Sequence, residues 1–220
     1  MSRRESVVIE VFGEGKTDVR HDPEAKSPTK GVVPILLYAL CDKPTHLLVR
    51  CFGTPFMMSK GPLRRKVRFA KRQAKANDSA GAVFVVDSEG DLRARLEELN
   101  KGRQMERSDL PMAVGVAHPC IEAWLLADPR AIRRAFRLAR SPEVPERPEQ
   151  CPAPRQDGGK DPKSLLARAA GLGRHLSADE CDRIAKAMRD VELVCQRCPA
   201  GFAPFAGEVR ARIRPLFKAG

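Results

Sequence analysis

The sequence predicts an α/β fold: a mainly parallel sheet of about four strands flanked by helices, with a helical C-terminal extension. Apolar β-branched runs alternate with helix-like segments along the first 140 residues, which is the pattern of consecutive βαβ units. Each predicted strand is also a continuous rather than an alternating apolar run. Such runs are typical of parallel sheets that are covered by helices on both faces.

The predicted elements follow one another in chain order. The strands are Val7–Phe12, His46–Phe52, Ala82–Val86 and Met112–Val116. The helices of this part are Val32–Leu40, Leu63–Ala76, Leu92–Leu99 and Ile121–Leu126. Residues 141–161 are rich in Pro and Gly, which indicates a loop or linker.

Three further helices are predicted beyond this loop. They are Pro162–Ala170, Ala178–Val194 and Gly207–Phe217, with Ser177 as the N-cap of the second. We therefore expect an α/β core over 1–140, the loop or linker over 141–161, and a helical extension over 162–220 that packs on the core.

Composition excludes several classes of protein. With 220 residues and 42% hydrophobic content the chain can bury a substantial core. No apolar run approaches the roughly 20 residues of a membrane span, and the N-terminus lacks the features of a signal peptide. The seven cysteines are scattered, as in reduced proteins, and the single CxxC at Cys195 and Cys198 does not favour zinc. We expect a cytoplasmic protein without a membrane partner.

The net charge of +12 favours a polyanionic partner, nucleic acid first, although a solvated basic surface is the alternative. The predicted nucleic-acid-binding residues share one basic segment without acids: Lys60, Arg64, Arg65, Lys66, Arg68, Lys71, Arg72 and Lys75. On a helix, Arg64, Arg68, Lys71 and Lys75 form one stripe while Leu63, Val67 and Ala70 face inward. A second basic cluster runs from Arg130 to Arg140.

The first strand leads into Gly13-Glu14-Gly15-Lys16-Thr17-Asp18, which superficially looks like a phosphate-binding P-loop. A P-loop needs a glycine five positions before Gly-Lys-Thr, where this chain has Glu10. Glu14 would also place negative charge against the phosphates. If a helix starts nearby, Glu14 and Asp18 share a face and can hold one cation. A turn with solvent-facing acids is the alternative.

A later strand ends in Asp87, followed by Glu89 and Asp91 at alternating positions. Functional groups gather at the carboxyl ends of strands in such sheets, and converging acids repel unless a cation neutralises them. Asp91 also suits the N-cap of the next helix. Asp87 and Glu89 are therefore the better ligand candidates, with Asp91 as a third.

Two further sites carry charge into apolar or glycine-rich surroundings. Glu122 lies inside Ile121–Leu126, where it either meets a metal or a basic partner or simply faces the helix dipole. Lys160 and Lys163 follow the Pro/Gly-rich loop, and either one can stabilise charge on a scissile phosphate or remain solvated.

Together these motifs resemble the Toprim fold of topoisomerases, bacterial primases, ribosomal-RNA maturases and OLD-family nucleases. Glu14 matches the glutamate of that fold, and Asp87 and Glu89 match its acidic pair, with Glu replacing the second Asp. GEGKTD is similar to the signature of the OLD-like branch, in which the acid corresponding to Asp18 also contributes to metal binding. HPCIEAWLLAD (118–128), KDPKSLL (160–166) and GFAPF (201–205) are similar to motifs of an uncharacterised bacterial Toprim-like family.

The resemblance implies a metal-dependent endonuclease, with DNA favoured as substrate, in an anti-phage or mobile-element defence system. One or two Mg²⁺ or Mn²⁺ ions are expected on Glu14, Asp18, Asp87, Glu89 and Glu122, with no nucleotide cofactor in this chain. The uncharacterised family is often encoded beside an ABC- or SMC-type ATPase, which is the expected partner, and homodimerisation is left open. The alternatives are an RNA-cleaving Toprim nuclease, acting on tRNA or rRNA, and a non-catalytic nucleic-acid-binding module.

Overall fold

The computed structural model describes residues 6–15, 17–53, 61–153 and 159–217. Within these residues five strands form one sheet in the order β2-β3-β1-β4-β5. Their bounds are β1 Val7–Gly13, β2 Asp22–Lys26, β3 Leu47–Phe52, β4 Gly81–Asp87 and β5 Met112–Ala117. Strand β2 runs antiparallel to β3, and the other pairs are parallel. The predicted α/β class with a mainly parallel sheet is confirmed, and the arrangement is Rossmann-like.

Strand β2 was not predicted, because its sequence, Asp-Pro-Glu-Ala-Lys, is polar and contains a proline. It pairs at the edge of the sheet, through Asp22 with Cys51 and Lys26 with Val49, across an irregular register. Edge strands tolerate charge and proline since one side of their backbone faces solvent. A search for apolar runs therefore cannot find this polar edge strand.

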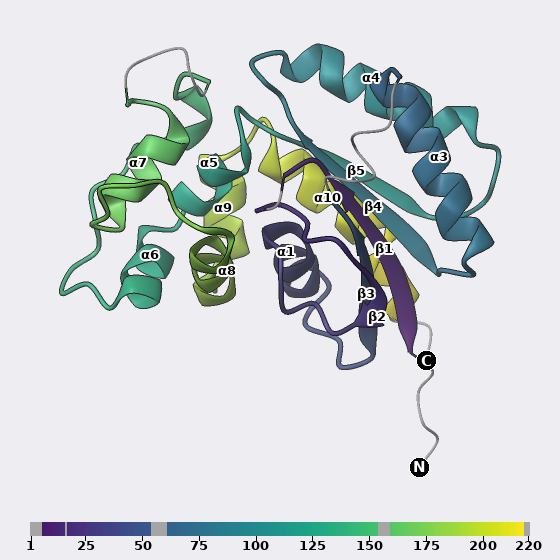
Figure 1. Ribbon diagram of the computed structural model, residues 1–220, viewed down its shortest axis with the longest axis horizontal. Coiled ribbons are helices and arrows are strands. Elements are labelled where there is room, and N and C mark those ends of the chain that lie inside the picture. The colour runs from purple at the N-terminus through teal and green to yellow at the C-terminus, as the bar shows by residue number, and fades with distance from the viewer. Residues whose placement is uncertain (1–5, 16, 54–60, 154–158, 218–220) are drawn as a thin grey trace.

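The helices cover both faces of the sheet (Figure 1). Their bounds are α1 Val32–Leu40, α3 Leu63–Ala76, α4 Leu92–Met105, α5 Ile121–Leu126, α6 Pro129–Phe136, α7 Pro162–Ala169, α8 Ala178–Ala187, α9 Val191–Arg197 and α10 Phe202–Arg212, with short 3₁₀ turns at Pro148–Gln150 and Arg214–Phe217. Helices α3 and α4 pack on one face, where Phe12 and Phe84 are fully buried. Helices α1 and α10 lie on the other face, in a core that also contains Trp124.

The C-terminal helices differ from the prediction in two places. The segment predicted as Ala178–Val194 is two helices, because the backbone is extended at Met188 and Asp190 starts a new helix by accepting a hydrogen bond from Leu193 N. Helix α10 begins at Phe202 rather than at Gly207 and ends at Arg212.

Local capping explains two other boundaries. Helix α6 was not predicted; it starts at Pro129 because the Asp128 carboxylate accepts from Ala131 N. The predicted cap Ser177 is confirmed, and with Glu180 it forms a capping box.

Parallel pairing brings the carboxyl ends of β1, β4 and β5 to one edge of the sheet, at Gly13, Asp87 and Ala117. Loops that leave this edge carry the acids singled out in the sequence. No helix in the described part of the chain is both long enough and apolar enough to cross a membrane.

Candidate functional site

The turn after β1 folds its acidic side chain inward. The Asp18 carboxylate is 4% exposed and accepts a hydrogen bond from Gly15 N at 3.1 Å. A Cβ atom at Gly15 would stand 2.8 Å from Asp18 Oδ2, so the close approach requires glycine here. The carbonyls of Thr17 and Asp18 in turn accept from Val32 N and Val33 N at the start of α1. Gly15 therefore lets the Asp18 carboxylate fold against the turn, and the backbone of the turn is fixed to the start of α1.

Asp87, at the end of β4, joins the turn after β1 to α5. Its Oδ1 accepts from Ile121 N, the first residue of α5, at 3.0 Å. Its own backbone N–H donates to the half-buried carboxylate of Glu14. One residue of the central sheet thus connects both neighbouring acidic segments.

Glu122 enters the same region from the first turn of α5. Its side chain is 10% exposed, and its Oε2 atom is buried without a hydrogen-bond partner among the described residues. Lys163 Nζ lies 3.9 Å from Glu122 Oε1, and the thiol of Cys120 also bonds to this carboxylate. Lys163 is placed on α7 by the cap Asp161, which accepts from Lys163 N at 3.0 Å and from Ser164 N at 3.2 Å.

The electrostatics show that these side chains act on one another. Burial and the negative charge of Glu122 raise the pKa of Asp18 to about 7, against the opposing effects of Gly15 N–H and Lys163. Burial, then Asp18 and Glu122, raise the pKa of Asp87 well above its ordinary value. Burial also raises the pKa of Glu14, although Arg95 opposes the shift.

Lys163 supplies the opposite charge at this place. The Glu122 carboxylate is the main cause of the raised pKa of the Lys163 amine, and Cys120, Asp87 and Asp18 add to it. Acids with raised pKa values that act on one another beside a lysine are typical of a functional site.

The donor set fits a hard divalent cation. Glu14, Asp18, Asp87 and Glu122 offer carboxylate oxygens, which Mg²⁺ and Mn²⁺ prefer, and the orphaned Oε2 of Glu122 lacks a partner that an ion would provide. In the described residues, however, no group of three or more His, Cys, Asp or Glu side chains already stands in an arrangement that could hold a metal.

The remaining predicted site residues take other positions. Glu89 has a left-handed backbone and a side chain that is 71% exposed; it forms an ion pair with Arg95 while its charge still acts on Glu14. Asp91 caps α4 by accepting from Ala94 N at 3.0 Å, so the capping role is confirmed. Lys160 is exposed, and the lysine that acts on the buried acids is Lys163.

Sequence reasoning missed two contributors. Arg95, on the first turn of α4, pairs with Glu89 and opposes the pKa shift of Glu14. Ser88 Oγ lies 2.8 Å from His118 Nδ1, and burial lowers the pKa of His118 so that its ring is neutral at pH 7. This pair joins the loops after β4 and β5. The only mark of this pair in the sequence is that Ser88 and His118 each directly follow a strand, which is a weak signal.

The basic helix α3 differs from the predicted stripe. Leu63, Val67 and Ala70 are buried as predicted, but Lys71 is also buried, at 7% exposure, and donates to Glu106 O. The prediction of an exposed Lys71 is wrong, because α4 packs across that side of the helix.

Acids of α4 and of its C-cap neutralise other parts of the stripe. Arg64 pairs with Glu98 at 2.7 Å, and Arg68 and Arg72 both approach Glu106, at 3.7 and 3.4 Å. Arg65 and Lys75 are exposed, and Lys60 lies outside the described residues.

The loop before α7 is anchored where it is described. Glu149 is 5% exposed, and its carboxylate accepts from Ala200 N, Gly201 N and Phe202 N at the start of α10. Arg197 holds the same segment by donating to the carbonyls of Pro145 and Glu146. These contacts fix the Pro-rich segment at residues 145–149, before it leads to α7 and Lys163.

The chain was compared with known protein families, with curated proteins and with solved structures, and none of them matches it.

Proposed function

We propose that this chain is a metal-dependent endonuclease of Toprim type, which hydrolyses phosphodiester bonds of nucleic acid, with DNA favoured. The observation that carries the proposal is the meeting of Glu14, Asp18, Asp87 and Glu122 beside Lys163 at the carboxyl edge of the sheet. The Rossmann-like sheet is compatible with a Toprim core. The defence role and the separate ABC- or SMC-type ATPase partner come with the resemblance alone.

The protein's own groups have separate tasks in this scheme. Asp18 and Asp87 are held by Gly15 N–H and Ile121 N–H, so each keeps an orientation while its other oxygen serves as a ligand. Glu14 and Glu122 complete the donor set. One or two Mg²⁺ or Mn²⁺ ions on these oxygens would supply Lewis-acid polarisation of the phosphate and lower the pKa of water.

Lys163 is the residue that would contact the scissile phosphate. Its amine stays protonated because neighbouring carboxylates raise its pKa, and a positive charge at this position stabilises the charge that develops on the phosphate oxygens. Arg95 pairs with the exposed Glu89, and its positive charge also acts on Glu14.

Cleavage of plasmid DNA and of total RNA with Mg²⁺ or Mn²⁺ tests this function. We expect Asp87→Asn to lower the cleavage rate by at least about a hundredfold, because a ligand is lost with little change of shape. Asp91→Asn is the matched control: it removes an acid four residues away but preserves the helix cap, since Asn caps as well as Asp. It should cleave at the wild-type rate.

Cleavage that persists unchanged in Asp87→Asn contradicts the site. Preferential cleavage of RNA selects the RNA-directed alternative. Nucleic-acid binding without any divalent-ion binding in calorimetry would instead favour a non-catalytic module.

A further inference from the structure

A groove between α6 and α8 carries positive charge that nothing on its walls neutralises. The two helices lie side by side at the lower left of Figure 1. The residues that line the groove come from both helices and from the C-cap of α6: Arg134, Ala135, Phe136, Arg137, Arg183, Lys186 and Ala187. Four of these are cations and none is an acid.

Arg134 has a structural task at the floor of this groove. Its guanidinium donates to Ala187 O, at 2.7 Å from Nη2, and to the Asp128 carboxylate at 3.3 Å. Asp128 is the N-cap of α6 and Ala187 is the last residue of α8. Arg134 thus fixes the spacing of the two helices and is not available to a ligand.

The other cations remain at the surface. Arg183 stacks over the Phe136 ring at 5.1 Å and reaches Glu180 only at 3.7 Å. Arg137 and Lys186 are exposed, and neither forms an ion pair with any residue that the structure describes. Arg137 and Lys186 are therefore the unpaired charge of the groove, with Arg183 beside them in one long ion pair, and exposed Arg130, Arg133 and Arg140 add positive charge on the same segment.

This state contrasts with that of α3, where Arg64, Arg68 and Arg72 are paired with acids from the α4 side. Paired cations must lose their partners before they contact phosphate, whereas unpaired ones release only counterions. The groove is therefore the better phosphate-binding surface of the two.

The lining also limits the kind of occupant. Protein partners are usually anchored by buried apolar or aromatic side chains. Here the aromatic Phe136 is covered by Arg183, and the large exposed hydrophobics of the described chain, Phe69 and Met105, belong to α3 and α4. A row of arginine and lysine without an apolar anchor is complementary to a repeating phosphate backbone.

We infer that the α6–α8 groove binds the phosphate backbone of the nucleic-acid substrate through Arg137, Arg183 and Lys186. This inference rests on the proposed function, and it adds a substrate-binding surface outside the carboxylate site. Contacts with the backbone position the nucleic acid without reading its sequence.

The test is the salt dependence of binding to a fluorescent DNA duplex of about 30 base pairs, measured by anisotropy in EDTA so that no cleavage occurs. The Arg137→Gln/Lys186→Gln variant should reduce the slope of log Kd against log salt by about 2, because each lost phosphate contact contributes about one unit. Its affinity should fall at least about tenfold at moderate salt.

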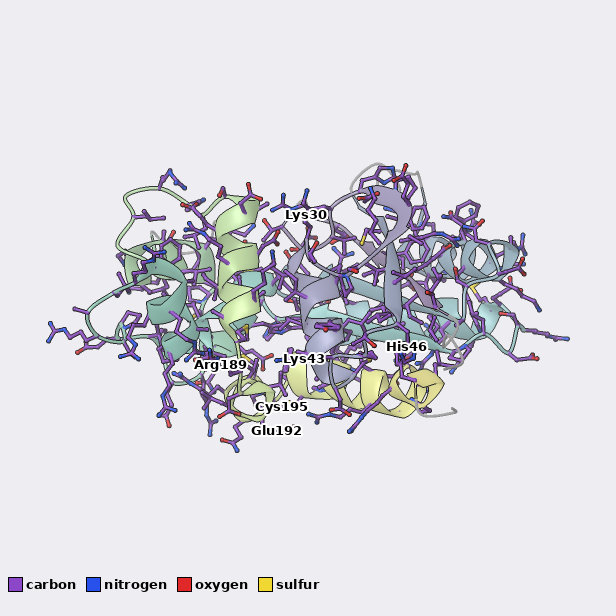
Figure 2. All side chains as sticks on the ribbon, turned by 90° about the horizontal axis from the view of Figure 1, so that it is seen from below. Lys30, Lys43, His46, Arg189, Glu192 and Cys195 are labelled. Carbon is purple, nitrogen blue, oxygen red and sulfur yellow. The ribbon has the colours of Figure 1, made fainter. Side chains whose placement is uncertain are left out.

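The matched control is Lys43→Gln/Arg107→Gln. Both residues are exposed, neither forms an ion pair with a described residue, and Lys43 has a left-handed backbone with φ 54, the value that Arg137 also has. They follow α1 and α4, and so stand at the amino edge of the sheet; Lys43 is marked in Figure 2. This variant should keep the wild-type slope, and both variants should keep the wild-type melting temperature.

The outcomes separate the two proposals. The proposal that the groove binds phosphate is overturned if the groove variant keeps the wild-type salt slope, or if both variants lose the same affinity for the duplex. This holds even if Mg²⁺-dependent cleavage is found. A loss of affinity and slope in the groove variant only supports phosphate binding by the groove. If the same preparation then shows no cleavage, the proposed nuclease activity is contradicted while the binding surface stands. A wild-type protein that does not bind the duplex in EDTA overturns the groove as well.

Discussion

At the scale of single residues, Asp18 shows how the fold gives an ordinary side chain an unusual property. Its carboxylate is buried next to Glu122, and its pKa is raised from 3.8 to about 7. An ionised Asp18 is therefore unfavourable in the folded, metal-free protein. Functional sites keep such an unfavourable ionisation when a bound ligand, here a cation, stabilises the charged carboxylate.

This property predicts a pH-dependent effect of Asp18→Asn. Between about pH 4 and pH 7 the unfolded chain has lost the Asp18 proton while the folded chain keeps it, so the wild-type protein loses stability as pH rises through this window. Asn cannot ionise and still accepts from Gly15 N. We expect the variant to be more stable than wild type by roughly 1–3 kcal/mol at about pH 8, and equally stable below about pH 4.

Urea unfolding at both pH values measures this difference. Asp78→Asn is the control, because Asp78 is exposed and its left-handed backbone, with φ 50, suits Asn. It should change stability little at either pH. A destabilised Asp18→Asn at about pH 8 would contradict the raised pKa.

The residues of the site differ in how far the sequence predicted them. Glu14, Asp18, Asp87 and Glu122 lie at or after strand ends or start a helix, and this local signal singles them out in the sequence; their role stays a prediction. The outward turn of Glu89 depends on Arg95, which lies on the next helix. Its position could not be predicted, because the left-handed backbone at Glu89 leaves no mark in the sequence.

At the scale of elements, the 3₁₀ turn Pro148–Gln150 serves α10 as an external cap. Glu149 brings a carboxylate to three N–H groups at the start of α10, where a helix has no carbonyl of its own to accept from them. Burial raises the pKa of Glu149, while these N–H groups oppose the shift. The favourable interaction with the positive end of the helix offsets part of the cost of this burial.

Glu149→Ala is therefore predicted to destabilise the protein by roughly 2–3 kcal/mol, since it leaves buried N–H groups without an acceptor. Glu146→Ala is the control: this residue is exposed, and the contact described for it, with Arg197, uses its backbone carbonyl. It should change stability by less than about 0.5 kcal/mol. Equal urea midpoints for the two variants would contradict the capping role.

Element prediction succeeded where periodicity or capping was local and failed where a distant part of the chain decided the outcome. Helix α3 and the cap Ser177 follow from neighbouring residues. The burial of Lys71 follows from the packing of α4, about 30 residues further along the chain. Strand β2 exists because β3 offers an edge.

At the scale of the whole molecule, the layers follow from the order of apolar runs, whereas the distribution of charge does not. The net charge of +12 is known from composition, but only the fold pairs α3 with acids near α4 and leaves Arg137 and Lys186 of the α6–α8 groove without an ion pair to a described residue. The charge that matters for a polyanion is thus a property of the assembled surface.

The stability of the whole molecule offers a test of the metal site without an activity assay. A ligand that binds the folded state adds stability of RT ln(1 + [L]/Kd), about 2.7 kcal/mol at a hundred times Kd. For a chain of this size that is a rise in melting temperature of roughly 5–10 °C. We expect Mn²⁺ to produce such a rise at about pH 8, where Asp18 is mostly ionised, and a smaller rise at about pH 5, where protons compete with the ion.

Glu122→Gln should abolish most of this rise, because it removes a charged ligand and keeps the side-chain shape. Asp91→Asn should retain it in full, since Asp91 caps α4 outside the carboxylate cluster. The same small rise in wild type and in Glu122→Gln would show that Mn²⁺ binds elsewhere. A rise that is larger at about pH 5 than at about pH 8 would contradict carboxylates as the ligands, since their protonation can only weaken ion binding.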